Sequence, residues 1–418
     1  MNNKTLGNIF KGDKVIWMVF FFLCMISIIE VYSASSSLTY KGGDFWAPMI
    51  KHIGTLIMGV FFMLVTINVP CKYFKVVTPF LLIFSVITLI WVLATGHSTN
   101  GAQRWVNLIG IQFQPSEIAK GTMVLAVAQI LSALQTDKGA EKRAMKYILI
   151  VGFFIIPFIM LENLSTAMLL CITVLCMMLI GRVPMSQIGK LLGVIVLISL
   201  VGFSAIMIFG KNVPDQNTNS KLTEKIATKT EKPGAISKIF HRADTWKSRI
   251  YKFMDSKPIP PEEINLDKDG QVAYANIAIA SSDIIGKGPG NSVERDFLSQ
   301  AFSDFIYAII IEEMGIEGAA FVAILYIIML FRTGKIVSQC ANNFPAFLAM
   351  GLAILLVTQA LFNMLVAVGL APVTGQPLPL VSKGGTSTVI NCVYVGVILS
   401  ISRSAAKRDT LKEETEVS

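Results

Sequence analysis

The sequence has little charge for its length. Of its 418 residues only 15% are charged, whereas 53% are hydrophobic. A soluble domain typically carries about 25% charged and 45–50% apolar residues. Because the excess of apolar side chains has no favourable place in water, the composition predicts a membrane protein and argues against a soluble enzyme.

Histidine is scarce, and the cysteines lack any pairing pattern. The three histidines (His52, His97 and His241) are far apart in the chain, and the six cysteines lie in or beside apolar runs without CxxC spacing. These absences argue against a zinc site and a disulfide framework. The net charge of +9 comes mainly from short connections between apolar runs, which is typical of membrane topology. We therefore expect no nucleic-acid partner.

The apolar residues fall into ten runs along the chain. A membrane-spanning helix needs roughly 20 mostly apolar residues. The expected spans are 15–34, 52–69, 74–95, 116–135, 147–161, 165–181, 188–210, 305–331, 344–370 and 387–402. The pattern therefore predicts an all-α integral membrane protein with about ten transmembrane helices.

Lysine and arginine predict the orientation, because they favour the cytoplasmic side of a membrane. The short connections on the side of the N-terminus are rich in both, whereas the short connections on the other side hold only Lys41, Lys51, Arg104 and Lys383. Both termini are therefore expected in the cytoplasm, with a large extracytoplasmic loop between helices 7 and 8. The expected parts are residues 1–13 (N-terminus), 14–210 (helices 1–7), 211–304 (loop), 305–402 (helices 8–10) and 403–418 (tail). Within the loop, the apolar patch 273–285 predicts a re-entrant or interfacial helix.

Ionisable residues in the fourth span form the first candidate site, because such residues are costly inside a membrane and mark function. Glu117 and Lys120, within QPSEIAK, are three residues apart and can pair on one helix face. Arg104, within the upstream NGAQRW, stands at the outer interface, where its guanidinium suits a phosphate. Two interpretations remain open: an internal ion pair with interfacial anchors, or a polar cavity that opens outward.

The second candidate site precedes the eighth span, in GKGPGNSVERDFLSQAFSDFIYAIIIEEMG (286–315). Its glycines predict a loop whose backbone can approach a ligand closely. Asp304 is either an N-cap or a partly desolvated carboxylate whose raised pKa suits a general base, and the two roles are compatible. Glu312 and Glu313 lie deeper, so at least one must face a protein cavity.

The third candidate site is the last outward loop, GLAPVTGQPLPLVSKGGTST (369–388). Irregular backbone near membrane depth is tolerated only where it is buried or lines a cavity. Lys383 is its only charge, and a lysine beside Gly384 and Gly385 suits either a structural loop or a phosphate-binding nest. All three sites fall on the outward side, which favours one cavity for an anionic, lipid-borne ligand.

These motifs resemble the SEDS family, which includes FtsW, RodA and SpoVE. The matching stretches are NGAQRW, QPSEIAK, GKGPGNS, SDFIYAIIIEEMG and PLPLVSKGGTS, in that order. Asn291 and Ser292 after the glycines look more like the division-type FtsW than the elongation-type RodA. The resemblance implies a multi-pass protein of the bacterial inner membrane at the division septum. It would polymerise lipid II with a class B penicillin-binding protein (a transpeptidase), other divisome proteins and membrane lipid as partners.

The resemblance also implies a mechanism of inverting transfer. Asp304, as general base, would take the proton of the acceptor 4-hydroxyl, which attacks the anomeric carbon of the donor sugar while undecaprenyl pyrophosphate leaves. The residues expected to contact substrate are Arg104, Glu117, Lys120, Lys383 and Ser292. The resemblance leaves open a divalent cation, Mg²⁺ or Mn²⁺, and implies no other cofactor.

The sequence departs from the family pattern at four positions. Ser299 and Gln300 stand where Pro-Glu is usual, Lys383 replaces a tyrosine, and Asn163 replaces an aspartate. A second carboxylate would then come from Glu294 or Asp296. Two other functions remain open. A lipid II flippase would need a polar path through the whole bilayer, and a scaffold for a transpeptidase would leave the buried charges unexplained.

Overall fold

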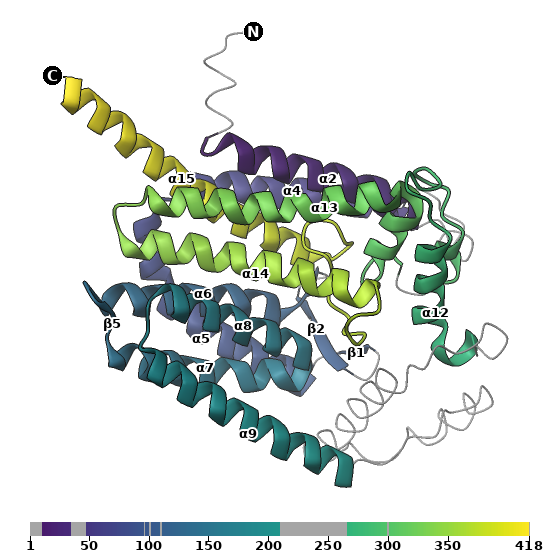
Figure 1. Cartoon of the computed structure of the whole chain (residues 1–418), viewed down its shortest axis with the longest axis horizontal. Helices are drawn as coiled ribbons and strands as arrows, with labels where there is room; N and C mark the ends of the chain where they lie inside the picture. The colour runs from purple at the N-terminus through teal and green to yellow at the C-terminus, as the bar shows by residue number, and fades with distance from the viewer. Residues whose placement is uncertain are drawn as a thin grey trace.

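The protein folds as a bundle of long helices that lie side by side (Figure 1). The structure is a computed structural model, and it describes residues 11–34, 47–95, 97–99, 102–108, 111–209, 266–298 and 301–417. In the view of Figure 1 the start of α2 and the end of α15 lie at the same end of the bundle, and the strands β1 and β2 and helix α12 lie at the other.

Every predicted span corresponds to one long helix. These helices are α2 (Lys14–Ala34), α4 (Ala47–Ile67), α5 (Cys71–Thr95), α6 (Pro115–Ala133), α7 (Lys142–Glu162), α8 (Leu164–Ile180), α9 (Met185–Phe209), α13 (Ile306–Ser338), α14 (Asn343–Ala367) and α15 (Thr386–Val417). Within the described residues, α2, α4, α5, α7, α13, α14 and α15 are long and apolar enough to cross a membrane. The prediction of a helical integral membrane protein is confirmed.

Several boundaries differ from the prediction for identifiable reasons. Helix α7 begins at Lys142 instead of 147, because the basic residues of its first turns are good helix formers, so they interrupt the apolar run without interrupting the helix. Helix α15 continues to Val417, through the residues assigned to a polar tail. Leucine, lysine and glutamate are good helix formers. The polar residues after 402 therefore end the apolar run of α15 but continue its helix.

Short strands are the main departure from the wholly helical expectation. Strands β1 (His97–Thr99), β2 (Ala102–Leu108) and β3 (Ile111–Phe113) form an antiparallel sheet in that order. Thr99 pairs with Ala102 across an Asn-Gly sequence, which strongly favours a two-residue hairpin. A second pair, β4 (Gln135–Thr136) and β5 (Gly139–Ala140), joins α6 to α7. Both sheets lie in connections, so the spanning part of the fold remains helical.

Glycine allows α4 and α15 to pack closely. A Cβ added at Gly59 would lie 2.7 Å from Cys392 Sγ, and one added at Gly396 would lie 2.9 Å from Met63 O. Lipid chains are as apolar as leucine, so helices in a membrane associate largely through close packing at small residues. Helix α2 instead packs on α13.

One end of the bundle is held together by Asp13. Its Oδ1 accepts hydrogen bonds from the backbone of Val15 and Ile16, which caps α2. Its Oδ2 lies 2.7 Å from Arg332 Nη2, and its backbone N–H donates to Ser402 Oγ at 2.8 Å. Helices α2, α13 and α15 therefore meet at this end, which we call the basic end. The opposite end, with residues 281–298 and 368–385, is the loop end.

Helix α12 (Leu266–Ala280) corresponds in part to the predicted interfacial helix at 273–285. It begins earlier and ends at Ala280, where the hydroxyls of Ser281 and Ser282 donate to carbonyls of its last turn. The chain beyond, to Ile285, is not helical. Tyr274 stacks on Phe297, with ring centroids 5.2 Å apart, which fixes α12 against the segment that leads into α13.

Candidate functional site

Asp304 lies at the loop end, immediately before α13. Its side chain is half-buried, and Ser303 Oγ donates to its Oδ1 at 3.0 Å. The N-cap residue of α13 is Phe305, which has no side-chain cap. The interpretation of Asp304 as an N-cap is therefore wrong, because the carboxylate stands one residue outside the cap position. It is held at the end of a membrane-spanning helix without being used to close that helix.

The loop that carries Lys383 is fastened to the segment that carries Asp304. The backbone N–H of Lys383 donates to Phe302 O at 3.0 Å, and Ser382 Oγ donates to Ser303 O at 2.7 Å. The ammonium group of Lys383 lies 5.2 Å from the centroid of the Phe302 ring. Burial, together with the charge of nearby Lys51, lowers the pKa of Lys383. The structure thus brings the second and third predicted sites together.

Two amides on α14 position this junction, and sequence reasoning missed both. Asn363 Nδ2 donates to Asp304 O at 2.9 Å and to Gln376 O at 2.7 Å. One turn earlier, Gln359 Nε2 donates to Pro377 O at 3.0 Å. Both side chains are 1% exposed. The available signal was a pair of amides four residues apart inside an apolar run, which places them on one helix face.

Glu117 and Lys120 form the predicted ion pair. Their charged atoms are 2.9 Å apart, and the side chains are only 2% and 1% exposed. Lys120 Nζ also donates to Gln359 Oε1 at 2.7 Å, so the pair connects through α14 to the loop of Pro377. This arrangement matches the internal ion pair that sequence analysis left open. Any direct contact of these two side chains with substrate remains a prediction.

Arg104 and Asn163 flank this region. Arg104 lies in β2, while its side chain and residues 299–300 lie outside the described residues. Asn163 caps α8 by accepting from the backbone N–H of Ser165 at 3.1 Å. Three residues on, Thr166 Oγ1 accepts from Gln376 Nε2 at 2.6 Å. Asparagine and aspartate are both good N-caps, so the departure at position 163 preserves this structural role.

Glu312 and Glu313 form a separate cluster with the glycine-rich loop, which we call the glutamate clasp (Glu312, Glu313 and residues 286–293). Both side chains are 0% exposed. The backbone N–H groups of Gly290 and Ser292 donate to Glu313 at 2.8 and 3.2 Å, and that of Val293 donates to Glu312 Oε1 at 3.0 Å. The loop backbone that was expected to approach a ligand here binds the protein's own carboxylates.

Cations and hydroxyls complete the clasp. Lys287 Nζ lies 2.6 Å from Glu312 Oε1, and Ser292 Oγ donates to Glu312 Oε2 at 2.5 Å. Arg295 Nη1 lies 3.7 Å from Glu313 Oε1. Buried charges are tolerated when they are paired and hydrogen-bonded. Ser292, expected to contact substrate, is 4% exposed and here binds a glutamate, and any contact with substrate remains a prediction.

Backbone atoms meet directly where the clasp closes on α13. Gly315 has φ of 70° and ψ of −173°, which kinks the helix. A Cβ at Gly315 would lie 2.1 Å from Ile284 O, and one at Gly286 would lie 2.3 Å from Gly315 N. Both glycines have positive φ, which other residues rarely adopt. We call this contact the glycine lock (Gly286 and Gly315).

The two candidates for a second carboxylate lie beside the clasp. Glu294 and Asp296 belong to a short 3₁₀ helix, Glu294–Asp296. Burial and the charge of Glu312 raise the pKa of Glu294, while Lys287 lowers it. Asp296 Oδ1 lies 3.8 Å from Arg295 Nε. Among the described residues no three His, Cys, Asp or Glu side chains are grouped to hold a metal ion.

The sequence predicted one outward cavity at Asp304. The cavities seen among the described residues between α2 and α4, along α5, α6 and α7, and beside α7 and α9 are not lined by Asp304. What the structure gives at Asp304 is a junction of three segments. It consists of the turn before α13, the loop of Lys383 and the polar face of α14.

Comparison with known proteins finds relatives that match nearly the whole chain. The sequence model of the FtsW/RodA/SpoVE family, described as "Cell cycle protein", matches residues 13–407. The chain is 27% identical over 405 residues to "Peptidoglycan glycosyltransferase MrdB" of Escherichia coli K12, covering 96% of each chain. It is 29% identical over 398 residues to "Probable peptidoglycan glycosyltransferase FtsW" of Geobacter sp. M18, covering 93% of this chain and 96% of the relative.

Solved structures share the fold. A chain from "Structural coordination of polymerization and crosslinking by a peptidoglycan synthase complex" superposes with a TM-score of 0.69 at 20% identity, covering 94% of this chain and 98% of that one. The rod shape determining protein RodA of Thermus thermophilus superposes with a TM-score of 0.60 at 19% identity, covering 94% and 97%. At this identity the likeness shows the fold.

Proposed function

Because this chain belongs to the FtsW/RodA/SpoVE family of cell cycle proteins, we propose that it is a peptidoglycan glycosyltransferase that polymerises lipid II in the inner membrane. The printed names of its relatives support the class of enzyme. The observation that carries the proposal within the molecule is the junction at the loop end, where a half-buried carboxylate stands beside a loop with a partly buried lysine.

Asp304 is the general base in this proposal. Backbone bonds from Asn363, Ser382 and Lys383 hold the segment 302–304, so the carboxylate is placed before substrate arrives. It would remove the proton of the acceptor 4-hydroxyl while that oxygen bonds to the anomeric carbon of the donor. The bond from that carbon to the pyrophosphate breaks with inversion, and undecaprenyl pyrophosphate leaves. Positioned general bases typically contribute about 10²–10⁴-fold to rate.

Lys383 would stabilise the negative charge that develops on the leaving pyrophosphate. Lys383 is partly buried and its ammonium group packs on an aromatic ring, and electrostatic interactions strengthen as water is excluded. Lys120 acts differently, because it is fully buried and paired with Glu117. We assign Lys120 a positioning role, transmitted through Gln359 to the loop of Pro377.

The division type is our further assignment. Asn291 and Ser292 follow the glycines as in FtsW, and septal cell-wall synthesis with a class B penicillin-binding protein is the corresponding role. The curated relatives carry both FtsW and MrdB names at similar identity, so overall identity does not separate the types. Depletion of the protein in its host should produce filaments if the role is division, and rounded cells if the role is elongation.

Reconstitution tests the enzymatic proposal. The full chain is placed in liposomes with its penicillin-binding partner, and labelled lipid II is added. We expect glycan polymer from the wild-type protein and none from Asp304→Asn. Movement of labelled lipid II between leaflets without polymer would instead support a flippase, and normal polymer from Asp304→Asn would overturn the assignment of the base.

A further inference from the structure

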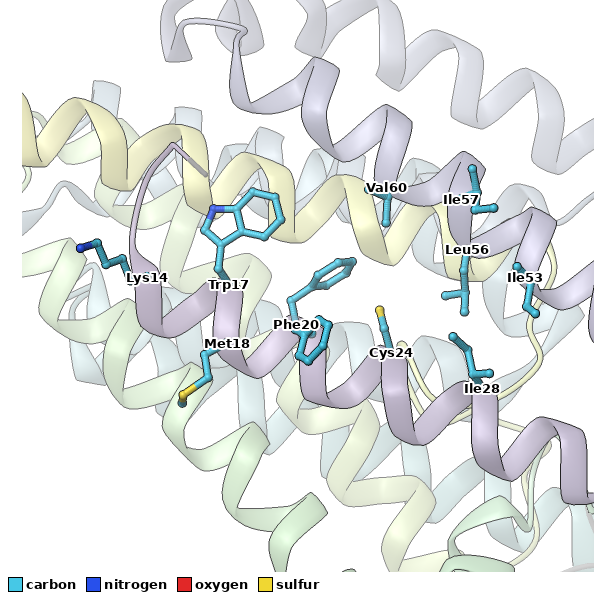
Figure 2. A pocket seen from close by; sticks show the side chains of 11 residues that line it. Lys14, Trp17, Met18, Phe20, Cys24, Ile28, Ile53, Leu56, Ile57 and Val60 are labelled. Atoms are coloured by element: carbon cyan, nitrogen blue, oxygen red, sulfur yellow. The ribbon is translucent and has the colours of Figure 1, made fainter. Parts of the chain in front are cut away.

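A groove with both apolar and basic side chains lies between α7 and α9. Its volume is about 650 Å³. Its lining includes three lysines (Lys142, Lys146 and Lys190) and an apolar stripe of α7 formed by Leu149, Ile150 and Phe153. The groove between α2 and α4 in Figure 2 is different, because Lys14 is the only charged residue among the described residues that line it. Three cations in one groove indicate an occupant that carries negative charge.

The groove exists because α7 and α9 are joined at their first turns and then part. Both helices begin at the basic end, where Gln187 Nε2 donates to Lys142 O at 3.3 Å. Figure 1 shows α9 diverging from α7 toward the loop end. A Cβ added at Gly189 or Gly193 of α9 would meet nothing within 4 Å. The two helices are therefore the walls of a cleft that is open to the membrane.

The lysines stand at similar levels near the basic end. Lys146 lies four residues after the start of α7, and Lys190 lies five residues after the start of α9, which is about 6–8 Å along each helix. All three lysines of the groove are exposed. Within the described part of the chain, the ion pairs involve none of them. A cluster of cations without a carboxylate is complementary to an anion.

The ends of the two helices add to this positive charge. The first backbone N–H groups of a helix have no partner within it, and the helix dipole is positive at that end. Glu141, the N-cap residue of α7, makes no capping hydrogen bond with its side chain. Because α7 and α9 both begin at the basic end, two positive helix ends lie on the same side of the membrane as the lysines of the groove.

The apolar stripe matches one leaflet of a membrane in length. From Lys142 to Phe153, α7 rises about 17 Å at 1.5 Å per residue. The hydrocarbon core of a bilayer is roughly 30 Å thick, so one leaflet supplies roughly 15 Å. Leu149, Ile150 and Phe153 are 43%, 44% and 70% exposed. An acyl chain whose head group lies at the lysines would therefore cover the stripe and end near the midplane.

We infer that the groove between α7 and α9 binds an anionic diacyl phospholipid, with its phosphate at Lys146 and Lys190 and one acyl chain on the apolar stripe of α7. The basic end is expected on the cytoplasmic side, where basic pockets between membrane-spanning helices bind anionic head groups. A soluble phosphate would contact the lysines and leave the stripe uncovered, whereas a lipid contacts both. The inference is independent of the proposed enzymatic function, because it needs only the helical bundle in a membrane.

Lipid adducts resolved by native mass spectrometry test the inference. The full chain in a neutral detergent is titrated with phosphatidylglycerol, and separately with zwitterionic phosphatidylcholine that carries the same acyl chains. The test variant combines Lys146→Gln with Lys190→Gln, and the matched control combines Lys72→Gln with Lys335→Gln. Lys72 and Lys335 are exposed at the basic end and do not line the groove. Both double variants therefore remove the same charge from the same end of the bundle.

We expect the test variant to bind its first phosphatidylglycerol about 25-fold more weakly than the wild type, because each lysine at an anionic lipid contributes roughly a factor of five. Its binding of phosphatidylcholine should not change, and the control should keep the wild-type affinity for both lipids. Lys146→Arg with Lys190→Arg should bind phosphatidylglycerol as the wild type does, since the charges are kept. Equal weakening in the test and control variants, or equal affinity of the wild type for the two lipids, would overturn the inference.

The acyl chain provides a separate arm. Ile150→Trp fills the groove, and Ile172→Trp on α8 is the matched control. Ile150 and Ile172 are 44% and 40% exposed, and each lies eight residues from the end of its helix at the basic end. The first variant should bind phosphatidylglycerol about fivefold more weakly, because packing of the chain is lost, and the second should bind it normally. Equal affinity in the two variants, or displacement of the bound lipid by soluble glycerol phosphate, would contradict a lipid in this groove.

Discussion

Asp304 and Glu313 are carboxylates nine residues apart in the same part of the chain, yet their surroundings are opposite. Glu313 is fully buried, and it accepts two backbone N–H bonds beside the guanidinium of Arg295. Asp304 is half-buried, its carboxylate accepts from the hydroxyl of its neighbour Ser303, and its backbone carbonyl accepts from Asn363 Nδ2. Burial of a charge in a membrane protein therefore has two meanings. Full burial with backbone amides and a guanidinium fastens Glu313 into the fold, whereas Asp304 keeps part of its surface open at the loop end.

The largest expected effect is a loss of polymerisation activity when Asp304, and not Glu313, is taken as the catalytic carboxylate and is replaced. Asp304→Asn should lower glycan polymerisation by about 10²–10⁴-fold, because the amide cannot accept the proton, while the melting temperature in detergent stays unchanged. The matched control is Asp283→Asn, since Asp283 is an exposed aspartate of the same loop end. A comparable loss of activity in the control would show that charge at this end matters in general.

The second effect is a loss of folding stability, which is expected when Glu313 is replaced. Glu313→Gln should lower the free energy of unfolding by about 3 kcal/mol, because it leaves Arg295 and two amide donors facing a neutral group. Titration with a denaturing detergent measures the change. Glu317→Gln is the control, because Glu317 lies one turn further along α13 and is exposed. If Glu313→Gln keeps full stability yet loses activity, the clasp belongs to the catalytic site and the comparison fails.

The glycine lock should show a stability effect of its own. Gly315→Ala places a methyl group against Ile284 O in a backbone conformation that alanine disfavours; the strained backbone alone costs about 1–3 kcal/mol, and the contact with the carbonyl oxygen adds to that cost. Gly334→Ala, in the same helix with open space at its Cβ, should be neutral or slightly stabilising. Thermal unfolding of the two variants side by side decides the matter, and equal melting temperatures would contradict the lock.

The smallest effect concerns pH. Because burial and Lys51 lower the pKa of Lys383, its charge, and with it pyrophosphate binding, should be lost at a lower pH than for an ordinary lysine. Lys51→Gln removes a like charge, so the pKa of Lys383 rises and binding should persist to higher pH. Binding measured against pH tests this, with Lys335→Gln at the basic end as control. A shift toward lower pH in Lys51→Gln would have the wrong sign.

The helices could be predicted from sequence because each apolar run is a local property. Packing between helices is not local, and the sequence does not reveal it. Gly59 of α4 faces Cys392 of α15, and Gly396 of α15 faces Met63 of α4. The pairing of Glu117 with Lys120 was predictable, because both lie on one face of one helix. The glutamate clasp was not, because the amides that bind Glu313 come from residues more than twenty positions away.

The same limit applies to the candidate site. Asp304 and Lys383 were candidates because a charge beside an apolar run has few structural roles, and the resemblance to the family added the role of general base for Asp304. Their junction depends on bonds from Ser382 to Ser303 and from Asn363 to Asp304, which join segments roughly sixty to eighty residues apart. Serine and asparagine are too common in loops and helices to signal such contacts.

The glycine lock has a consequence for chimeric proteins. The loop beginning at Gly286 and the helix at Gly315 touch through main-chain atoms, so neither surface can adapt by changing a rotamer. A loop transplanted from a relative will pack correctly only if the segment of α13 that it contacts in that relative is transplanted with it. The residues from 284 to 317 are therefore a single cassette, and crossover points for domain exchange belong outside it.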